Sequence, residues 1–298
     1  MKITERNLQE IGSSLLVSLP KEWTRLLNLK KGDSIKMRVS EEGSLIISPE
    51  FAKKQEKKET EFEYTKNFFR DFVRSYFAGN EKITIRIKPG MPNADLDYIH
   101  DSLKKLMNVQ IIEESSLKIV IKCFRIEELS IEECLRRMYF ISLDILDEVI
   151  SNNNKSKIRE LESSLTKFYF MLVMQIRRFL EEGKFIEQNQ ISLVRAMDCR
   201  MVGEKIERIA DILRSLYNLN DKDLELIIIL RSLYEKSFNC FISNIYGKSK
   251  EIFNGNEEKK FERIENNAKK TKNFQRYLQI ISLKKILSYT KEIGFLTR

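Results

Sequence analysis

The chain has 298 residues, of which 42% are hydrophobic and 33% are charged, and its formal net charge is +9. This length allows two or three domains, and the composition is that of a charge-rich globular protein rather than a disordered chain. Its apolar runs, such as LIIIL at 226–230, are too short to span a bilayer. No basic and apolar leader opens the sequence, which predicts a cytoplasmic protein without a transmembrane segment.

Residues that bind zinc or form nucleophile–base pairs are scarce. The four cysteines (Cys123, Cys134, Cys199 and Cys240) form no CxxC pair, and His100 is the only histidine. These counts argue against a zinc site of thiolates and imidazoles and against a catalytic triad. No glycine-rich phosphate loop is present. The sequence therefore predicts that the protein is not an enzyme and that carboxylates would hold any metal.

Residues 1–50 consist of short strand patterns separated by turn signals. Fifty residues of this kind bury little apolar surface, so we expect dimerisation to stabilise them. The expected elements, in chain order, are a strand over SLLVSL (14–19), a brief helix over PKEWTRLL (20–27) with Pro20 in its first turn, a turn at KKGD, and hairpin strands over SIKMRVS (34–40) and SLIIS (44–48).

A small α/β domain is predicted over residues 63–125. It follows FAKKQEKKETEF at 51–62, a charge-dense stretch that is typical of a linker or the start of a solvated helix. The elements expected within the domain are a helix over YTKNFFRDFVRSYFAGN that ends at Gly79, a strand over KITIRI, a helix over 94–107, and strands over NVQIIEE and SLKIVIKC.

The rest of the chain is predicted to be helical. All four prolines precede residue 93, and the apolar spacing beyond residue 127 is that of helices. We expect a domain over 127–298 made of two three-helix repeats, at about 127–220 and about 221–298. The six expected helices cover 130–152, 156–182, 190–219, 222–246, 250–272 and 274–295.

The positive charge is concentrated at the end of the chain. Residues 1–50 carry eight lysines and arginines against seven acidic residues, a net charge of +1, whereas residues 224–298 carry fifteen against eight, a net charge of +7. Such a basic region could accept a nucleic acid, an acidic protein or an anionic membrane surface. It could equally be an ordinary solvated face.

The opening segment closely resembles the SpoVT/AbrB-like domain. The matching features are Gly-Ser-Ser before the first strand, SLPKEW at the entry to the short helix, LKKGD in the turn, and GSLIISP in the closing strand. In that family two chains interlock into a swapped-hairpin β-barrel that presents basic residues to DNA. The resemblance therefore implies a homodimer with DNA as its partner.

Six residues of this segment are candidates for DNA contacts. Lysine and arginine would supply salt-dependent attraction to phosphates, and amide side chains could reach base edges. The phosphate candidates are Lys2, Arg6, Lys21 and Arg25, and the base-edge candidates are Asn7 and Gln9. The near-neutral charge of the segment leaves open a barrel that dimerises without binding DNA.

Three carboxylates are predicted to share one helix face in the helical domain. Glu204, Glu207 and Asp211 stand three and then four residues apart, which places them on one side of a helix. Such a row of oxygen ligands could bind Mg²⁺, Mn²⁺ or iron. It could instead be a solvated face paired with Lys205 and Arg208.

The surrounding stretch, DCRMVGEKIERIAD at 198–211, resembles the signature of the PhoU family of phosphate-uptake regulators. Members of that family are tandem three-helix bundles, whose Glu/Asp-x-x-x-Asp motifs bind multinuclear iron or zinc clusters. The resemblance extends over 127–298 in helix order. It implies a divalent or iron-type cation in the first repeat, with these ligands: Glu162, Glu204, Glu207 and Asp211.

This chain departs from the PhoU pattern in both repeats. In the first repeat, Thr166 stands where the family has a second acid after Glu162. In the second repeat, Lys284 and Ser288 occupy the two acidic places, and a protonated lysine cannot coordinate a cation. The metal site is therefore expected to be incomplete in the first repeat and absent from the second.

Together the resemblances imply a multidomain α+β protein that is mostly α, similar to the archaeal type of phosphate-uptake regulator. The implied function is that of a phosphate-responsive transcriptional regulator, which binds DNA through its N-terminal barrel and receives a signal through its PhoU-like domain. The alternative is an adaptor that regulates a phosphate transporter or a signalling protein by protein–protein contact. A metal-dependent phosphatase is disfavoured by the missing acids.

Overall fold

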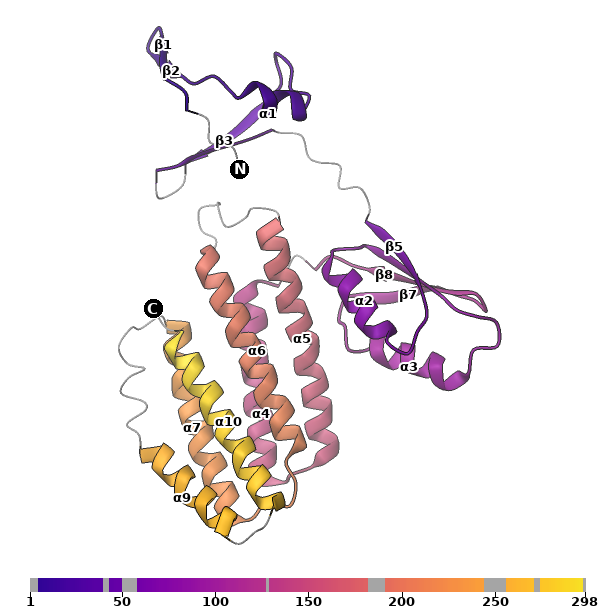
Figure 1. Cartoon of the computed structure of the whole chain (residues 1–298), viewed down its shortest axis with the longest axis vertical. Coiled ribbons are helices and arrows are strands. Elements are labelled where there is room, and N and C mark those ends of the chain that lie inside the picture. Colours follow the sequence, from indigo (N-terminus) through magenta and orange to yellow (C-terminus); the bar gives the residue numbers. More distant parts are fainter. Residues whose placement is uncertain are drawn as a thin grey trace. The chain divides into compact units, whose positions relative to one another are not determined.

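The computed structural model describes residues 5–39, 43–49, 58–126, 129–181, 191–243, 256–270 and 274–296. The chain divides into two compact units. The first contains the described residues of Met1–Glu56, and the second contains those of Lys57–Phe185 and Ile191–Arg298. Figure 1 shows the second unit as a small α/β domain beside a set of long helices. The protein is thus a mostly helical α+β protein.

The N-terminal unit consists of two antiparallel hairpins and one short helix. Its elements are β1 (Gln9–Ile11), β2 (Ser14–Leu16), α1 (Lys21–Leu26), β3 (Ile35–Val39) and β4 (Leu45–Pro49). β1 pairs with β2 and β3 pairs with β4, and these are two separate two-stranded sheets. The expected hairpin and brief helix are confirmed. The described residues of one chain do not close into a barrel, so the expected swapped-hairpin barrel of two chains stays a prediction.

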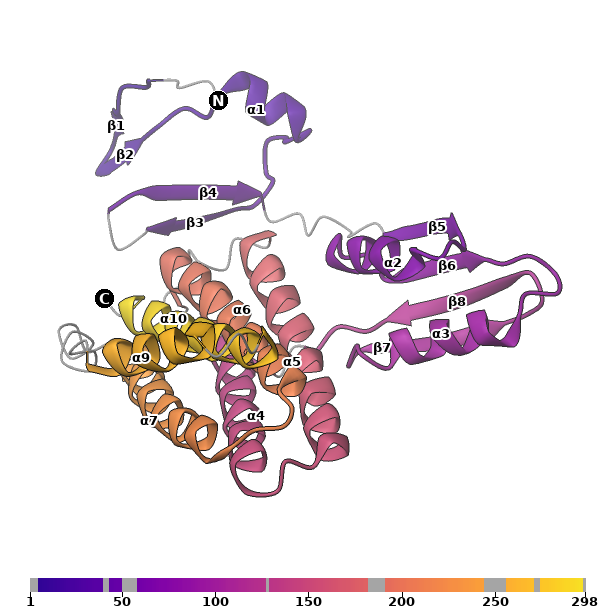
Figure 2. The ribbon, with the colours of Figure 1, turned by 60° about the horizontal axis from the view of Figure 1, so that its bottom comes forward.

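The α/β domain is a four-stranded sheet with helices α2 and α3 packed against it. Strand β5 is parallel to β6, the other pairs are antiparallel, and the order across the sheet is β5-β6-β8-β7. Figure 2 shows α3 running alongside β7 and β8. The elements are β5 (Glu59–Glu63), α2 (Phe68–Phe77), β6 (Lys82–Arg86), α3 (Asn93–Leu103), β7 (Val109–Glu114) and β8 (Lys118–Cys123).

Strand β5 corrects the expectation that residues 51–62 are a linker or the start of a helix, because residues 59–63 form an edge strand. Its sequence, ETEFE, alternates between the two faces of the sheet. Phe62 packs against the domain core, whereas Glu59 and Glu61 pair with Lys82 and Arg86 of β6. The high charge that suggests a linker is therefore the polar face of a strand. Residues 51–57 lie outside the described residues.

The helical region contains the expected six helices. They are α4 (Ile131–Ser151), α5 (Lys155–Glu181), α6 (Leu193–Ser215), α7 (Asp221–Ser243), α9 (Asn256–Lys270) and α10 (Phe274–Phe295). Where the ends of the expected helices fall within the described residues, they agree closely except around α6. That helix begins later than expected because Ser192 caps it, and it ends earlier because Leu216 takes an extended conformation with a ψ of 141°.

Aromatic packing joins the first three helices to the last three. The rings of Tyr139 on α4 and Phe238 on α7 are stacked with centroids 3.8 Å apart. One turn further along α4, the Ser142 hydroxyl lies 2.7 Å from the Tyr234 hydroxyl and donates to the Tyr139 carbonyl. All four side chains are buried, so the contact between α4 and α7 is both apolar and hydrogen-bonded.

A buried ion pair fixes the starts of α7 and α10. Asp223, whose side chain is fully buried, accepts a hydrogen bond from the guanidinium of Arg276. Asn220 and Asp223 also cap the start of α7 reciprocally, because each backbone N–H donates to the other's side chain. Both helices therefore depend on a charge that has no access to water.

Replacing Arg276 by methionine keeps much of the side chain's apolar contact but leaves the Asp223 carboxylate buried without its cation. We expect the free energy of unfolding to fall by about 3–5 kcal/mol, the usual cost of breaking a buried pair. Urea denaturation of the full chain measures this change. Arg263→Met, on the exposed side of α9, is the matched control. Equal stability of Arg276→Met and the unchanged protein would contradict the expectation.

Candidate functional site

The N-terminal unit has no buried core within one chain. Among the residues of this unit whose exposure is described, none is buried. Nine large apolar side chains are exposed to between 41% and 81% of their surface: Leu8, Ile11, Leu15, Leu16, Val17, Leu26, Met37, Val39 and Leu45. Leaving this much apolar surface in water is unfavourable, and exposed patches of this kind are typical of interaction surfaces.

Five of the six candidate DNA-contact residues lie on the surface of this unit. Arg6 and Asn7 precede β1, Gln9 begins that strand, and Lys21 and Arg25 lie one turn apart on α1; all five are exposed. Lys2 lies outside the described residues. Within the described part of the chain, no hydrogen bond or ion pair joins the residues near β1 to those on α1, so the two sets form separate groups.

The three cations among these candidates have no acidic partner within the described residues. The Arg6 guanidinium donates only to the backbone carbonyl of Glu5, at 3.3 Å. Lys21 and Arg25 follow each other on the same side of α1 and make no ion pair with a described residue. Their charges are therefore available to an anionic ligand.

The four candidate metal ligands lie along the contact between α5 and α6. Glu162 comes from α5, and the other three acidic residues come from α6. Arg214 Nε lies 3.8 Å from Glu162 Oε2, and Arg214 NH2 donates to Asp211 Oδ1 at 3.3 Å. Arg200 NH1 lies 3.8 Å from Glu204 Oε2. Guanidinium groups thus provide counter-charges for three of the four carboxylates.

Thr166, which stands in place of an acid, donates its hydroxyl to Glu162 Oε1 at 3.3 Å. Within the described residues, no three His, Cys, Asp or Glu side chains are placed so that they could hold a metal ion. The residues present therefore do not form a complete ligand set, and the metal site stays a prediction. In the second repeat, Ser288 donates to Glu292, which also pairs with Lys205 of α6 at 2.7 Å.

Glu207 differs from the other three carboxyl groups in its surroundings. Burial, followed by the negative charge of Asp211, raises its pKa to about 7. Glu162 and Glu204 add smaller effects in the same direction, and Arg208 opposes them. Near neutral pH the Glu207 carboxyl therefore changes between its protonated and its charged form, while its neighbours are paired with arginines.

The four carboxylates are candidate metal ligands from the sequence alone, whereas the pairing of Arg214 with two of them was not predicted. This arginine stands three residues after Asp211, so the two share one side of α6. That spacing was the available signal. The approach of Glu162 from α5 could not be deduced from spacing along a single helix.

Comparison with known proteins finds a match only for the N-terminal part of the chain. Residues 8–58 match the family described as "Antidote-toxin recognition MazE, bacterial antitoxin". These residues are therefore a domain of the MazE/AbrB type, which is typically a DNA-binding domain. No curated protein and no solved structure matches the chain. Among the described residues, no helix has both the length and the apolar content needed to cross a bilayer.

The raised pKa of Glu207 has a measurable effect on stability. Between the pKa of about 4.5 expected in the unfolded chain and about 7 in the folded protein, the folded state binds the additional proton. Stability should therefore fall as the pH rises through this range. In Glu207→Gln we expect a weaker decrease in melting temperature between about pH 5 and about pH 8.

Melting curves recorded across this pH range test the expectation. Glu160→Gln, at an exposed position of α5, removes a carboxyl outside the cluster and should leave the pH dependence unchanged. Parallel pH profiles for Glu207→Gln and the unchanged protein would show that Glu207 titrates normally.

Proposed function

We propose that the protein is a homodimeric DNA-binding transcriptional regulator whose two copies associate through their N-terminal domains. One observation carries this proposal: a MazE/AbrB-type domain leaves its large apolar side chains exposed in the single chain. A second copy, interlocked as a swapped-hairpin barrel, would cover them. Each buried side chain of this size contributes about 1.5–3 kcal/mol, and several together are enough for association.

DNA is the partner that fits the unpaired cations of this domain. Two-fold symmetry would present Arg6, Lys21 and Arg25 twice on one barrel. These side chains would bind phosphates, and Asn7 and Gln9 would be available for base edges. Lys2 belongs to the same proposal from the sequence alone. The symmetric arrangement favours a DNA site with two related half-sites.

For the helical region we propose a PhoU-like receiver of a phosphate-related signal. The support is the order of six helices as two sets of three, together with the carboxylate row on α6 that resembles the family signature. The proposed location is the cytoplasm. A cation in the first repeat would have to displace Arg214 from Glu162 and Asp211.

We propose that the protein is not an enzyme. Burial raises the pKa of Cys123, Cys134 and Cys199 to about 12, which suppresses their reactive thiolate form. His100, at the surface of the α/β domain, pairs with Glu114 at 3.2 Å. This histidine has no serine or cysteine nucleophile among its described hydrogen-bond partners.

The alternative is an adaptor that dimerises through the same domain and regulates a phosphate transporter or a signalling protein by contact. One observation favours it, namely the net charge of +1 over residues 1–50. A weakly charged domain offers few phosphate contacts. DNA binding by the full-length protein separates the two functions, because the adaptor would dimerise and bind no DNA.

The proposed dimer can be tested with a charge placed at a position that is exposed in one chain. Met37 is 61% exposed and lies on the β3–β4 hairpin. Met37→Asp should be harmless to a monomer but should separate the dimer, because a carboxylate would be buried in the shared core. Sedimentation velocity measures the change in mass.

Lys36→Asp, at the neighbouring exposed position on the opposite face of β3, is the matched control. A chain that begins at Lys58 should also sediment as a monomer. A truncated chain that stays fully dimeric would place the main interface in the helical or α/β region.

Removing phosphate-binding cations should weaken DNA binding and its dependence on salt. Replacing Arg6 or Arg25 by alanine removes one proposed phosphate contact per copy. We expect the slope of log affinity against log salt to decrease by about one unit for each phosphate that is no longer neutralised. Fluorescence anisotropy with a labelled duplex measures it. An unchanged slope in both variants would show that the phosphate contacts lie on other residues.

A further inference from the structure

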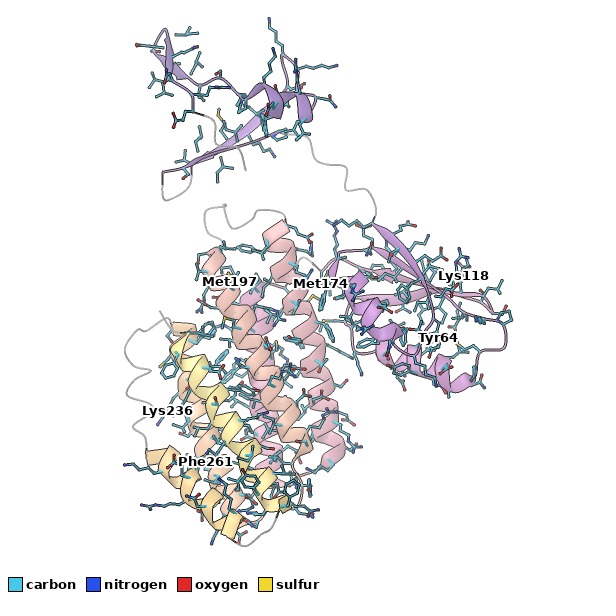
Figure 3. The ribbon with its side chains drawn as sticks, in the orientation of Figure 1. Tyr64, Lys118, Met174, Met197, Lys236 and Phe261 are labelled. Atoms are coloured by element: carbon cyan, nitrogen blue, oxygen red, sulfur yellow. The ribbon has the colours of Figure 1, made fainter. Side chains whose placement is uncertain are left out.

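Two sides of helix α2 are packed: one against the sheet of the α/β domain and the other against α5. One side is buried against the sheet through Phe68, Phe72 and Tyr76. A second side meets α5, where the ring of Phe170 lies 6.3 Å from that of Phe69 and 5.7 Å from that of Phe77. Figure 3 shows Met174, which joins the same apolar cluster, on the side of α5 next to this domain. These contacts leave one remaining side of α2 exposed.

The exposed side of α2 and its preceding turn is basic. Lys66, Arg70 and Arg74 stand four residues apart, so they follow one another along this side at steps of about 6 Å. Lys66 and Arg70 are exposed and make no ion pair with any described residue. Arg74, with 76% of its side chain exposed, has only a 3.9 Å contact with Asp71.

A fourth cation extends this row onto α5. The guanidinium of Arg177 lies over the ring of Phe77, 5.4 Å from its centroid, and donates to the Phe77 carbonyl at 3.0 Å. Phe77 is three residues after Arg74 and therefore adjacent to it on the helix. We call Lys66, Arg70, Arg74 and Arg177 the α2 basic surface.

On the open face of the sheet in the same domain, the positive charges are paired with acids. There Lys82, Arg86 and Lys118 pair with glutamates on neighbouring strands, with Lys82 3.3 Å from Glu59 and Lys118 2.8 Å from Glu113. Those charges neutralise one another. On α2 the like charges repel, because four-residue spacing places them next to each other without an equal number of acids.

We propose that the α2 basic surface is a second contact for the phosphate backbone of DNA held by the N-terminal domain. This inference rests on the proposed function. A row of closely spaced cations matches a polymer that carries one phosphate per strand every 3.4 Å or so. Guanidinium groups bind phosphates with two parallel hydrogen bonds, and both cations on α2 itself, Arg70 and Arg74, are arginines.

The N-terminal domain supplies the reason for a second contact. With a net charge of +1 over residues 1–50, it releases few counterions when it binds DNA. Nine residues, 50–58, join β4 to β5. Their maximum length of about 30 Å keeps a tethered basic surface at high local concentration near bound DNA. Weak phosphate contacts on α2 would thereby add to the total affinity.

The test compares two double variants of the full-length chain that each remove two positive charges. Arg70→Ala with Arg74→Ala removes half of the α2 basic surface. Arg136→Ala with Arg137→Ala removes two exposed arginines of α4 and serves as the control. Affinity for a short random-sequence duplex is measured over a range of salt concentrations, after melting curves have shown that each variant is folded.

The expected result is a slope of log affinity against log salt that is smaller in the α2 variant by about two units for each α2 basic surface of the dimer that contacts the duplex, and unchanged in the control. If Arg6→Ala with Arg25→Ala weakens binding while the α2 variant binds normally, this inference fails and the proposed function stands. If both double variants weaken binding and lower the slope, the inference is supported; if only the α2 variant does so, the N-terminal contact fails, and with it the inference that α2 is a second contact. A protein that binds no DNA at low salt overturns both.

An anionic membrane is the remaining candidate for the same charges. Vesicles of phosphatidylserine and phosphatidylcholine provide the probe. Binding of the unchanged protein to these vesicles, abolished in the α2 variant while its DNA binding and salt slope are unchanged, would overturn the inference and assign the surface to lipid headgroups.

Discussion

Within the described part of residues 1–50, a single chain leaves its large apolar side chains exposed, and the rest of the proposed assembly follows from this constraint. Nine large apolar residues are exposed in the described part of this segment, and six of them lie on hairpin strands of only three to five residues. A symmetric partner would cover the same surface on both chains with one interface. Dimerisation would then duplicate every feature attached to it, so that two α2 basic surfaces and two helical regions accompany each barrel.

The helices were predictable from the sequence because each buries one apolar side over many turns. The 3.6-residue period is repeated about six times in α4 and about seven times in α5, so the sequence indicates both the presence and the ends of these helices. Capping residues sharpen the starts, as Ser130 does for α4 through hydrogen bonds to and from Glu133. Local sequence was sufficient wherever the determining contacts lie within one helix.

Features that depend on distant partners were not predictable. Strand β5 looks like a linker because its polar face carries three glutamates, and only pairing with β6 makes it a strand. Arg214 pairs with Glu162 across two helices, which no spacing along one helix predicts. The expected barrel is not closed by the described residues of one chain, and its two-chain form stays a prediction. Lys66 and Arg70 make no ion pair within the described residues, and this is a property of the three-dimensional structure that the sequence does not show.

The stack of Tyr139 on Phe238 has a consequence for how the six helices behave as a whole. Two duplicated bundles joined only by a chain connection could loosen independently, each as its own cooperative unit. Here a ring from the first three helices lies flat on a ring from the last three, beside a hydroxyl pair that excludes water. Separating the halves would expose all of these groups together. The halves are therefore thermodynamically coupled, and a strain that displaces α4 is transmitted to α7 instead of being absorbed between them.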